Sequence, residues 1–306
     1  MSSTRFPMAL GILACCSVAC GATTDQGPDG AGGGVLAYCY QPVSGAALKE
    51  IWTINADGRG NQRIVSAQVS LNYPAWSPDG QRLAMVGYVN SQTWSIYVAG
   101  ADGSGLRRLT DEAAVWDGDP DWSPDGTKIV FTRTYPNQDN RTEIWVTEVD
   151  GGVPTRTGLL GMAARWSPDG TRFVYSSGAT SDADIMTARV DGTGEAHLTA
   201  SASTEIQPMW SPDGSRIAYA SNADGDFDIY VMNADGSSPT RITDNAAGDF
   251  SPRWSPDGSW IALESDLSGP EHWEVYLMRP TGTEWKRVTN TPASATAINP
   301  AWKPSP

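Results

Sequence analysis

A five-residue motif, Trp-Ser-Pro-Asp-Gly, recurs through the chain at a nearly constant spacing. Its copies begin at Trp76, Trp122, Trp166, Trp210 and Trp254, and a degraded sixth copy begins at Trp302. Successive tryptophans lie 46, 44, 44, 44 and 48 residues apart. A fixed period in the forties predicts a series of equivalent units, because one such unit cannot bury its apolar surface alone.

One period, residues 203–243, encodes four short strands. A first strand ends at Trp210, and Ser-Pro-Asp-Gly then predicts a hairpin turn with a Gly bulge. β-Branched and aromatic residues predict further strands at 216–220, 228–232 and 240–243. The other periods keep this order, and no segment has the pattern of a helix.

Four-stranded units of this length are typical of β-propeller blades. The first unit, from about Val35, lacks a tryptophan strand, whereas the C-terminal segment 298–302 is a tryptophan strand with nothing after it. We therefore expect an all-β, six-bladed β-propeller of four-stranded blades, closed by the C-terminal strand completing the first blade. Closure would remove an exposed sheet edge.

The repeated motif itself is expected to be structural. A tryptophan wedged between blades would bury ~150–250 Å², worth roughly 4–6 kcal/mol before entropy costs. The Asp of each motif would accept hydrogen bonds from nearby backbone amides of the turn.

Several further strings accompany the motif. Arg/Lys-Ile-Ala-Phe/Tyr, Asp-Ile-Tyr-Val and Arg-Leu-Thr follow the Pro-x-Trp-Ser-Pro-Asp-Gly string at regular places. Over about residues 35–302 the chain resembles the TolB-type propeller repeat family, a relative of the WD repeats. The resemblance implies the propeller fold and, less specifically, a docking role for partner proteins.

Composition favours one acidic, exported domain. The chain has 35 acidic and 21 basic residues and a net charge of −14, spread over turns and loops. Such a field argues against binding nucleic acid or an anionic membrane surface. Residues 35–306 suffice for one propeller domain, expected to be monomeric.

The N-terminal segment is different in kind. Residues 1–19 have one positive charge and a short apolar run, which predicts a lipoprotein-type signal peptide. Residues 20–34 form a Gly-rich segment expected to be a flexible tether. Cys20 follows small residues as in a bacterial lipobox, and its lipidation would be the only membrane attachment; Cys15 and Cys16 are alternatives, as is ordinary cleavage.

Catalytic chemistry lacks its usual residues. The chain has no Gly-x-Ser-x-Gly string, and its two histidines, His197 and His272, fall in different blades. They cannot both serve one triad and make a poor metal site. The single domain cysteine, Cys39, is expected in the core. We expect no enzyme activity, no cofactor and no metal.

Two runs of alternating carboxylates, residues 224–228 and 117–121, are candidates for binding a cation or for acid–base chemistry. Asp224-Gly-Asp-Phe-Asp228 does not match a calcium loop, because Ile229 stands where that loop needs Gly. Asp117, Asp119 and Asp121 form the second run, and nothing identifies a partner for acid–base work. Both runs are interpreted mainly as loop residues.

Variable loops opposite the uniform turns are the expected binding region, since binding residues favour loops on a rigid scaffold. Positions three and one residues before each tryptophan, and aromatics in the same loops, supply candidates. They are Tyr73, Trp94, Trp116, Asp119, Asp121, Arg165, Gln207, Phe250, Arg253 and Asn299. Aromatics and Arg among polar residues suit interface anchors, although simple loop packing would also explain them.

Two functions follow. The first is a non-catalytic lipoprotein of the cell envelope, periplasmic or at the cell surface on a bacterial membrane, the outer one favoured, whose propeller binds a protein or peptide. The alternative is a propeller that binds or acts on carbohydrate, with Trp94 or Trp116 stacking on a neutral sugar.

Overall fold

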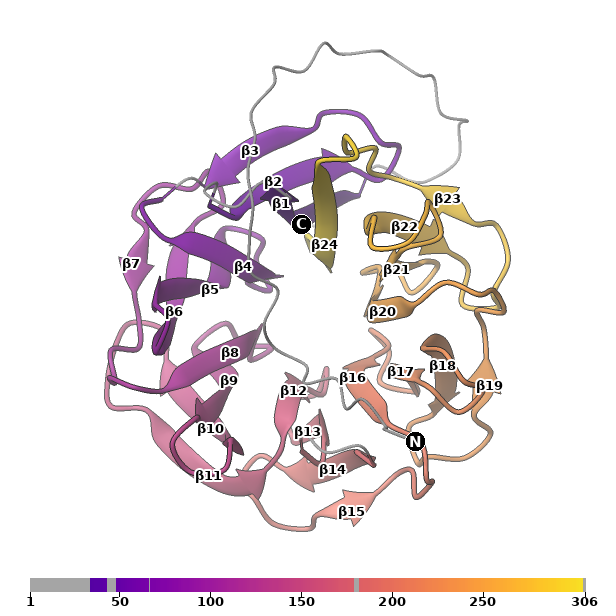
Figure 1. Ribbon diagram of the computed structural model, residues 1–306. Coiled ribbons are helices and arrows are strands. Elements are labelled where there is room, and N and C mark those ends of the chain that lie inside the picture. Colours follow the sequence, from indigo (N-terminus) through magenta and orange to yellow (C-terminus); the bar gives the residue numbers. More distant parts are fainter. Residues whose placement is uncertain (1–33, 43–47, 66, 179–181, 305–306) are drawn as a thin grey trace, which may run out of the picture.

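The computed structural model describes residues 34–42, 48–65, 67–178 and 182–304, and all regular structure in these ranges is β-strand. The sheets stand side by side around a common centre (Figure 1). The expected signal peptide, Cys20 and the expected tether up to residue 33 lie outside the described residues. No helix of the described part is long and apolar enough to cross a membrane.

The strands form four sheets of four strands and one sheet of eight. The first sheet, in the order β24-β1-β2-β3, contains β24 (Ala295–Trp302), β1 (Val35–Pro42), β2 (Glu50–Asn55) and β3 (Gln62–Val65). β24 pairs antiparallel with β1, so the two ends of the described chain share one sheet.

The eight-stranded sheet consists of two four-stranded units. The first unit contains β4 (Ser70–Trp76), β5 (Arg82–Asn90), β6 (Thr93–Gly100) and β7 (Arg107–Arg108). The second contains β8 (Trp116–Trp122), β9 (Lys128–Tyr135), β10 (Arg141–Glu148) and β11 (Thr155–Leu160). A single parallel pair, Trp94 with Trp116, joins the units.

The remaining three sheets repeat the same order from the centre outward (Figure 1). One contains β12 (Met162–Trp166), β13 (Arg172–Ser176), β14 (Ile185–Arg189) and β15 (Ala196–His197). The next contains β16 (Glu205–Trp210), β17 (Arg216–Ser221), β18 (Asp228–Asn233) and β19 (Thr240–Arg241). The last contains β20 (Asp249–Trp254), β21 (Ile261–Ser265), β22 (Glu274–Met278) and β23 (Lys286–Arg287).

The motif turns have the predicted chemistry. In the turn after Trp210, Gly214 has a φ of 70° and its N–H donates to the Ser211 carbonyl at 2.9 Å. The Asp213 carboxylate accepts from the Ser211 hydroxyl at 2.5 Å and from the Ser215 N–H at 3.0 Å. These bonds fix the hairpin and explain why Ser, Asp and Gly recur together.

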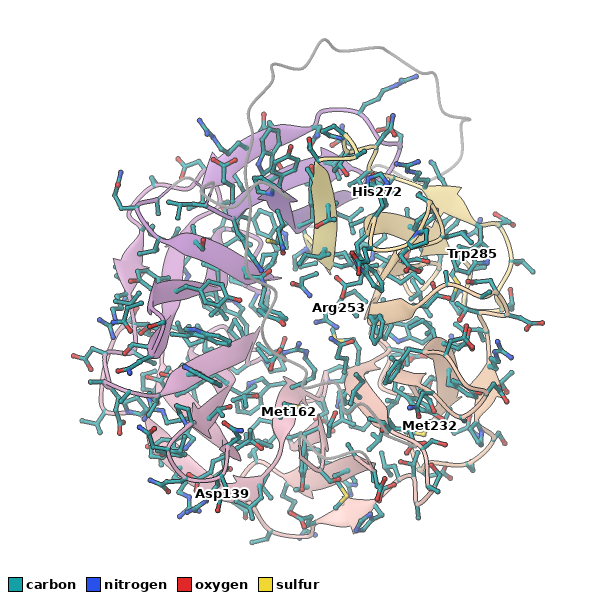
Figure 2. All side chains as sticks on the ribbon, in the orientation of Figure 1. Asp139, Met162, Met232, Arg253, His272 and Trp285 are labelled. Carbon is teal, nitrogen blue, oxygen red and sulfur yellow. The ribbon has the colours of Figure 1, made fainter. Side chains whose placement is uncertain are left out.

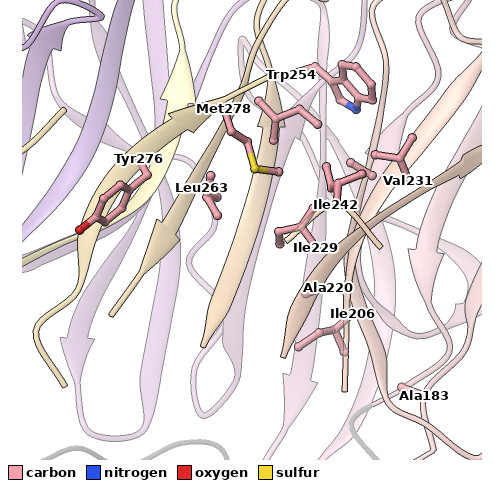
Figure 3. Packing of buried hydrophobic residues seen from close by; sticks show 12 residues of the cluster. Ala183, Ile206, Ala220, Ile229, Val231, Ile242, Trp254, Leu263, Tyr276 and Met278 are labelled. Atoms are coloured by element: carbon pink, nitrogen blue, oxygen red, sulfur yellow. The ribbon is translucent and has the colours of Figure 1, made fainter. Parts of the chain in front are cut away.

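The motif tryptophans pack between sheets. Trp254, 4% exposed, lies in a cluster that β16–β18 of the preceding unit share with β21 and β22 of its own unit, near Val231 and Ile242 (Figure 3). Trp122 lies against Ile96 of the preceding unit in the same way. Each tryptophan therefore joins its own unit to the one before, which is the wedge that the motif predicts.

The outermost strands are shorter than the sequence suggested. The strand expected at 240–243 ends at Arg241, because the Thr243 hydroxyl, and not a backbone carbonyl, accepts the Ile229 N–H at 2.9 Å. The same bond recurs from Ile96 to Thr110 and from Val275 to Thr289. In each of these units the threonine hydroxyl accepts a backbone N–H of the neighbouring strand, and the backbone pairing of the outer strand ends before the threonine.

The unit of β8–β11 differs from the others in its outermost strand. β11 has six residues, whereas β7, β15, β19 and β23 have two each. The sequence pattern missed this strand, because it lacks the pair of an aliphatic residue and Thr that follows β7, β15, β19 and β23.

Candidate functional site

All six innermost strands, β4, β8, β12, β16, β20 and β24, contain the same backbone irregularity. The residue three places before each tryptophan has a left-handed φ between 50° and 56°. These residues are Tyr73, Asp119, Ala163, Gln207, Ser251 and Asn299. The pairing register between the first and second strand of each unit shifts at this point. Each inner strand therefore carries a β-bulge, a feature that re-aims side chains.

Neighbouring units hold several of these bulges in place. The Gln207 side-chain oxygen accepts the Ser251 N–H at 2.9 Å. Glu264 accepts the Asn299 N–H at 2.5 Å with one oxygen and the Ser251 hydroxyl at 3.0 Å with the other. A left-handed φ costs a non-glycine residue energy and persists only where its surroundings enforce it. The Gln207–Ser251 and Glu264–Asn299 bonds between units, with the Glu264–Ser251 bond inside one unit, supply that enforcement.

A pocket of about 100 Å³ opens among the inner strands. It is lined by the bulge segments and the tryptophans that follow them; its polar and large side chains are Tyr73, Asp121, Arg165, Met209, Arg253, Asn299 and Trp302. The Arg253 side chain points toward the centre of the ring (Figure 2). Five of the ten residues expected to bind a partner thus meet in one pocket. The expectation that the ten lie in loops is wrong, because the bulged inner strands and β6 extend to include all of them.

The two pocket arginines are held mainly by backbone oxygens. One terminal nitrogen of Arg165 donates to the Asp119 carbonyl at 3.0 Å, and one of Arg253 donates to the Pro252 carbonyl at 2.9 Å. Arg165 is 4% exposed. Burial, followed by the charge of Arg165, lowers the pKa of the Arg253 guanidinium to about 9.

Carboxylates share this region with the arginines. Asp121 accepts the Trp166 N–H at 2.9 Å with one oxygen. Burial raises the pKa of Asp121, against the opposing effect of Arg165, and burial also raises the pKa of Glu264. The centre of an acidic protein therefore holds two arginines among carboxyl groups whose ionisation is disfavoured.

The other aromatic candidates, Trp94, Trp116 and Phe250, do not line this pocket. Trp94 and Trp116 stack on each other, with ring centroids 4.9 Å apart and planes at 17°, and Tyr88 meets Trp94 edge-on. Phe250 packs between Phe227 and Trp273. These side chains are half-buried, and their contacts with one another explain most of their placement.

Asp119 and Gln207 belong to the bulges without lining the pocket. Both are half-buried, and each serves a neighbouring unit, Asp119 through its carbonyl to Arg165 and Gln207 through its side chain to Ser251. Cys20 lies outside the described residues.

Sequence reasoning missed two buried acids. Glu264 bonds two bulges, and Asp249 begins β20 fully buried, where burial raises its pKa to about 6. Neither stands in a recurrent string. A weak signal for the bulges did exist, since Pro follows the bulge residue at positions 74, 120, 208, 252 and 300.

The alternating carboxylates are partly absorbed by ion pairs. Arg241 contacts Asp228 at 2.7 Å and Asp224 at 3.3 Å. Asp117 is buried and forms a two-pronged pair with Arg133 at 2.7 and 2.8 Å. Arginine side chains therefore balance part of the charge of both runs.

The two histidines have separate local partners. His197 pairs with Met186 in the register that Arg241 occupies opposite Tyr230, and its ring contacts Asp184 at 3.1 Å. His272 contacts Thr291 at 3.2 Å and Glu274 at 3.3 Å. In the described part of the chain, no group of three or more His, Cys, Asp or Glu side chains is placed to hold a metal ion.

This arrangement of repeated four-stranded sheets around a central pocket places the protein among the propellers. The family described as the TolB beta propeller domain matches residues 36–206 and 162–305, and the chain belongs to that family.

Relatives match over part of their length. An uncharacterized protein of Agrobacterium fabrum is 34% identical over 92 residues, 30% of each chain. The Tol-Pal system protein TolB of Alcanivorax borkumensis is 30% identical over 78 residues, 26% of this chain and 18% of that protein. The matched regions thus span less than a third of these relatives.

A solved structure agrees with the fold. The crystal structure of TolB from Acinetobacter baumannii superposes with a TM-score of 0.77 at 20% identity, over 89% of this chain and 67% of that one. At that identity the likeness shows the fold alone.

Proposed function

We propose that the chain is a non-catalytic scaffold of the bacterial cell envelope that binds a protein or peptide at its central pocket and at the loops around it. One observation carries the proposal: six inner strands share one bulged backbone but present different side chains at it. A rigid frame with variable side chains is the usual construction of a binding site.

The relatives support this class of function. Several bear the name Tol-Pal system protein TolB, and a protein named for a system is expected to act with other components. We also propose a six-bladed ring closed by β24 in the first blade; the antiparallel pairing of β24 with β1 supports it. A closed ring exposes no inner sheet edge for self-association, which favours a monomer.

Export and anchoring belong to the same proposal. The apolar leader and Cys20 would place the mature chain on the periplasmic or outer side of a membrane, held by a lipid and a short tether. The absence of enzyme activity is proposed because His197 and His272 are engaged in different blades with different partners.

A second candidate is binding of a neutral carbohydrate at the Trp94–Trp116 stack. Both rings are half-buried and lie at the loop side of their strands, where β6 and β8 meet. Aromatic faces suit sugar rings, but these two rings already cover one face of each other. Loss of glycan binding in Trp94→Ala, without loss of partner capture, would favour this candidate.

The proposal is tested by site-specific photo-crosslinking in intact cells. The photoreactive residue is placed at Gln92, in the exposed loop between β5 and β6, at Met209 in the wall of the pocket, where both arginines are kept, and at Val153, 91% exposed near the outer strand β11. We expect one envelope protein to be captured from the first two positions and not from Val153. Equal capture from all three, or capture of no protein with the chain folded and abundant, would contradict a docking role for the centre.

A further inference from the structure

We propose that the central pocket binds a carboxylate group between Arg165 and Arg253. The inference rests on the proposed docking function and adds the chemistry of the partner: a peptide segment that places an acidic side chain or its C-terminal carboxylate into the pocket. It starts from the bonds that the two guanidinium groups make.

Both guanidinium groups keep donors in reserve. A guanidinium has five N–H donors. Within the described part of the chain, the hydrogen bonds of Arg165 all come from one terminal nitrogen, to the carbonyls of Asp119, Pro120 and Ala164. Arg253 uses one terminal nitrogen for the Pro252 carbonyl. The remaining donors are available for a ligand.

Neither arginine forms an ion pair with a carboxylate among the described residues, although other arginines of the chain do. Asp121 and Glu264 lie near enough to influence Arg253, but their hydrogen bonds within the described part of the chain go elsewhere: one Asp121 oxygen accepts the Trp166 N–H, and the two Glu264 oxygens accept the Asn299 N–H and the Ser251 hydroxyl. A buried charge is costly unless it is paired. The pocket therefore contains a buried arginine, Arg165, and a half-buried one, Arg253, and neither has a carboxylate as a direct partner among the described residues.

The charge of the surroundings selects among anions. Two arginines lie close to Asp119, Asp121 and Glu264, and burial raises the pKa of the latter two. A monoanion gains from both guanidinium groups and meets the repulsion of these carboxyl groups with a single charge. A dianionic phosphate would meet more, so the chemistry favours a carboxylate, which also matches the planar fork of a guanidinium.

The size and walls of the pocket suit a carboxylate on a short stem. The volume is about 100 Å³, and Tyr73, Met209 and Trp254 supply apolar wall surface beside the arginines. Apolar walls exclude water and strengthen charge-assisted hydrogen bonds. A large folded partner cannot enter, but a single side chain or chain end can.

The test measures binding of trifluoroacetylglycine to the purified whole chain by fluorine NMR, with trifluoroacetylglycinamide as the neutral match. Wild type is compared with Arg253→Gln, Arg253→Lys and Arg63→Gln. Arg63 is a surface residue paired with Glu50 at 2.9 Å, so its substitution removes the same charge far from the pocket. Melting curves and circular dichroism verify that each variant is folded.

We expect the carboxylate to bind at least about 10-fold more tightly than the amide, and Arg253→Gln to weaken it at least about 10-fold. Arg63→Gln should leave binding unchanged, and Arg253→Lys should retain part of it. Equal affinity for the amide, unchanged affinity in Arg253→Gln, or undetectable binding to wild type would overturn the proposal. Stronger competition by methylphosphonate would overturn the choice of carboxylate.

Peptide probes separate the two sources of the carboxylate. A blocked tripeptide with a central Glu and an amidated end is compared with a blocked tripeptide with a central Gln and a free end. Tighter binding of the first assigns the site to acidic side chains, and tighter binding of the second assigns it to a C-terminus. Failure of the docking function would be seen in the cellular crosslinking experiment. Failure of the carboxylate site would be seen in probe binding to the purified chain, so the two outcomes can be distinguished.

Discussion

The motif turns and the inner-strand bulges are only a few residues apart, yet they repeat in different ways. At the turns the side chains recur, so that Ser123–Asp125 and Ser211–Asp213 make the same bonds at 2.6 and 2.5 Å. At the bulges only the backbone recurs, with nearly equal φ at residues as unlike as Tyr73 and Ser251. Repetition of chemistry therefore identifies the frame, and repetition of geometry with varied chemistry identifies the candidate site.

The largest expected effect is on the frame. Trp254→Ala removes a side chain that joins two units and is 4% exposed. We expect the free energy of unfolding to fall by roughly 3–5 kcal/mol, because a cavity remains in a packed core. Chemical denaturation measures the loss. Gln207→Ala, a bulge variant that loses one hydrogen bond to Ser251, should cost only about 1 kcal/mol; equal losses would erase the distinction between frame and site.

The next effect depends on pH. Burial raises the pKa of Asp249 from 3.8 to about 6. Because the folded state holds this proton more tightly than the unfolded chain, the stabilisation is complete below the unfolded pKa and is lost as the pH rises through the folded value. Asp249→Asn should therefore be more stable than wild type by about 1–3 kcal/mol in mildly alkaline buffer. Denaturation at several pH values measures it.

A gain that persists unchanged in strongly acidic buffer would show that the Asp249 carboxyl does not titrate as its burial indicates. Asn245, whose side chain donates to Asp249 at 2.9 Å, provides the control, since Asn245→Ala should destabilise the protein most where Asp249 is ionised.

The smallest effect belongs to one turn carboxylate. Hydrogen bonds from Ser211 and from the Ser215 backbone, in that order, lower the pKa of the exposed Asp213 to about 2. The stabilisation is present above the unfolded pKa and is lost as the pH falls through the folded one. Solvent screening reduces its size, so Asp213→Asn should cost less than about 1 kcal/mol at neutral pH and nothing in strong acid. Thermal unfolding of wild type and Asp213→Asn at neutral and acidic pH measures the difference.

The sequence predicted the motif turns, the tryptophans between units and most strands well, because these features depend on side chains that recur in every period. Tryptophan, Ser-Pro-Asp-Gly and the strand strings located the turns, the wedges and most strands. It missed β11, where the aliphatic–Thr pair of the other outer strands is absent, and overextended β19, because a threonine hydroxyl replaces the backbone acceptor there. Thr243 is a residue typical of strands, so the sequence pattern does not show that its hydroxyl, and not its backbone carbonyl, accepts the Ile229 N–H.

The candidate site was predicted in part. Arg165 and Arg253 were chosen from their place before the tryptophans, and the structure puts both in one pocket. The stacking of Trp94 on Trp116 was not foreseen, because the contact depends on two units meeting at one parallel pair. Glu264 was missed for the same reason: its bonds reach β24 and β20 from a strand whose own pattern shows only burial.

The most direct test of the account compares partner capture by two arginine variants in intact cells. Arg253→Gln changes the pocket, whereas Arg82→Gln changes the frame, where Arg82 lies over the ring of Trp122 at 4.8 Å. With amounts of folded protein matched, binding at the central pocket predicts that Arg253→Gln loses the partner and that Arg82→Gln retains it. Retention by Arg253→Gln together with loss in Arg82→Gln would place the binding surface on the motif turns and contradict the account.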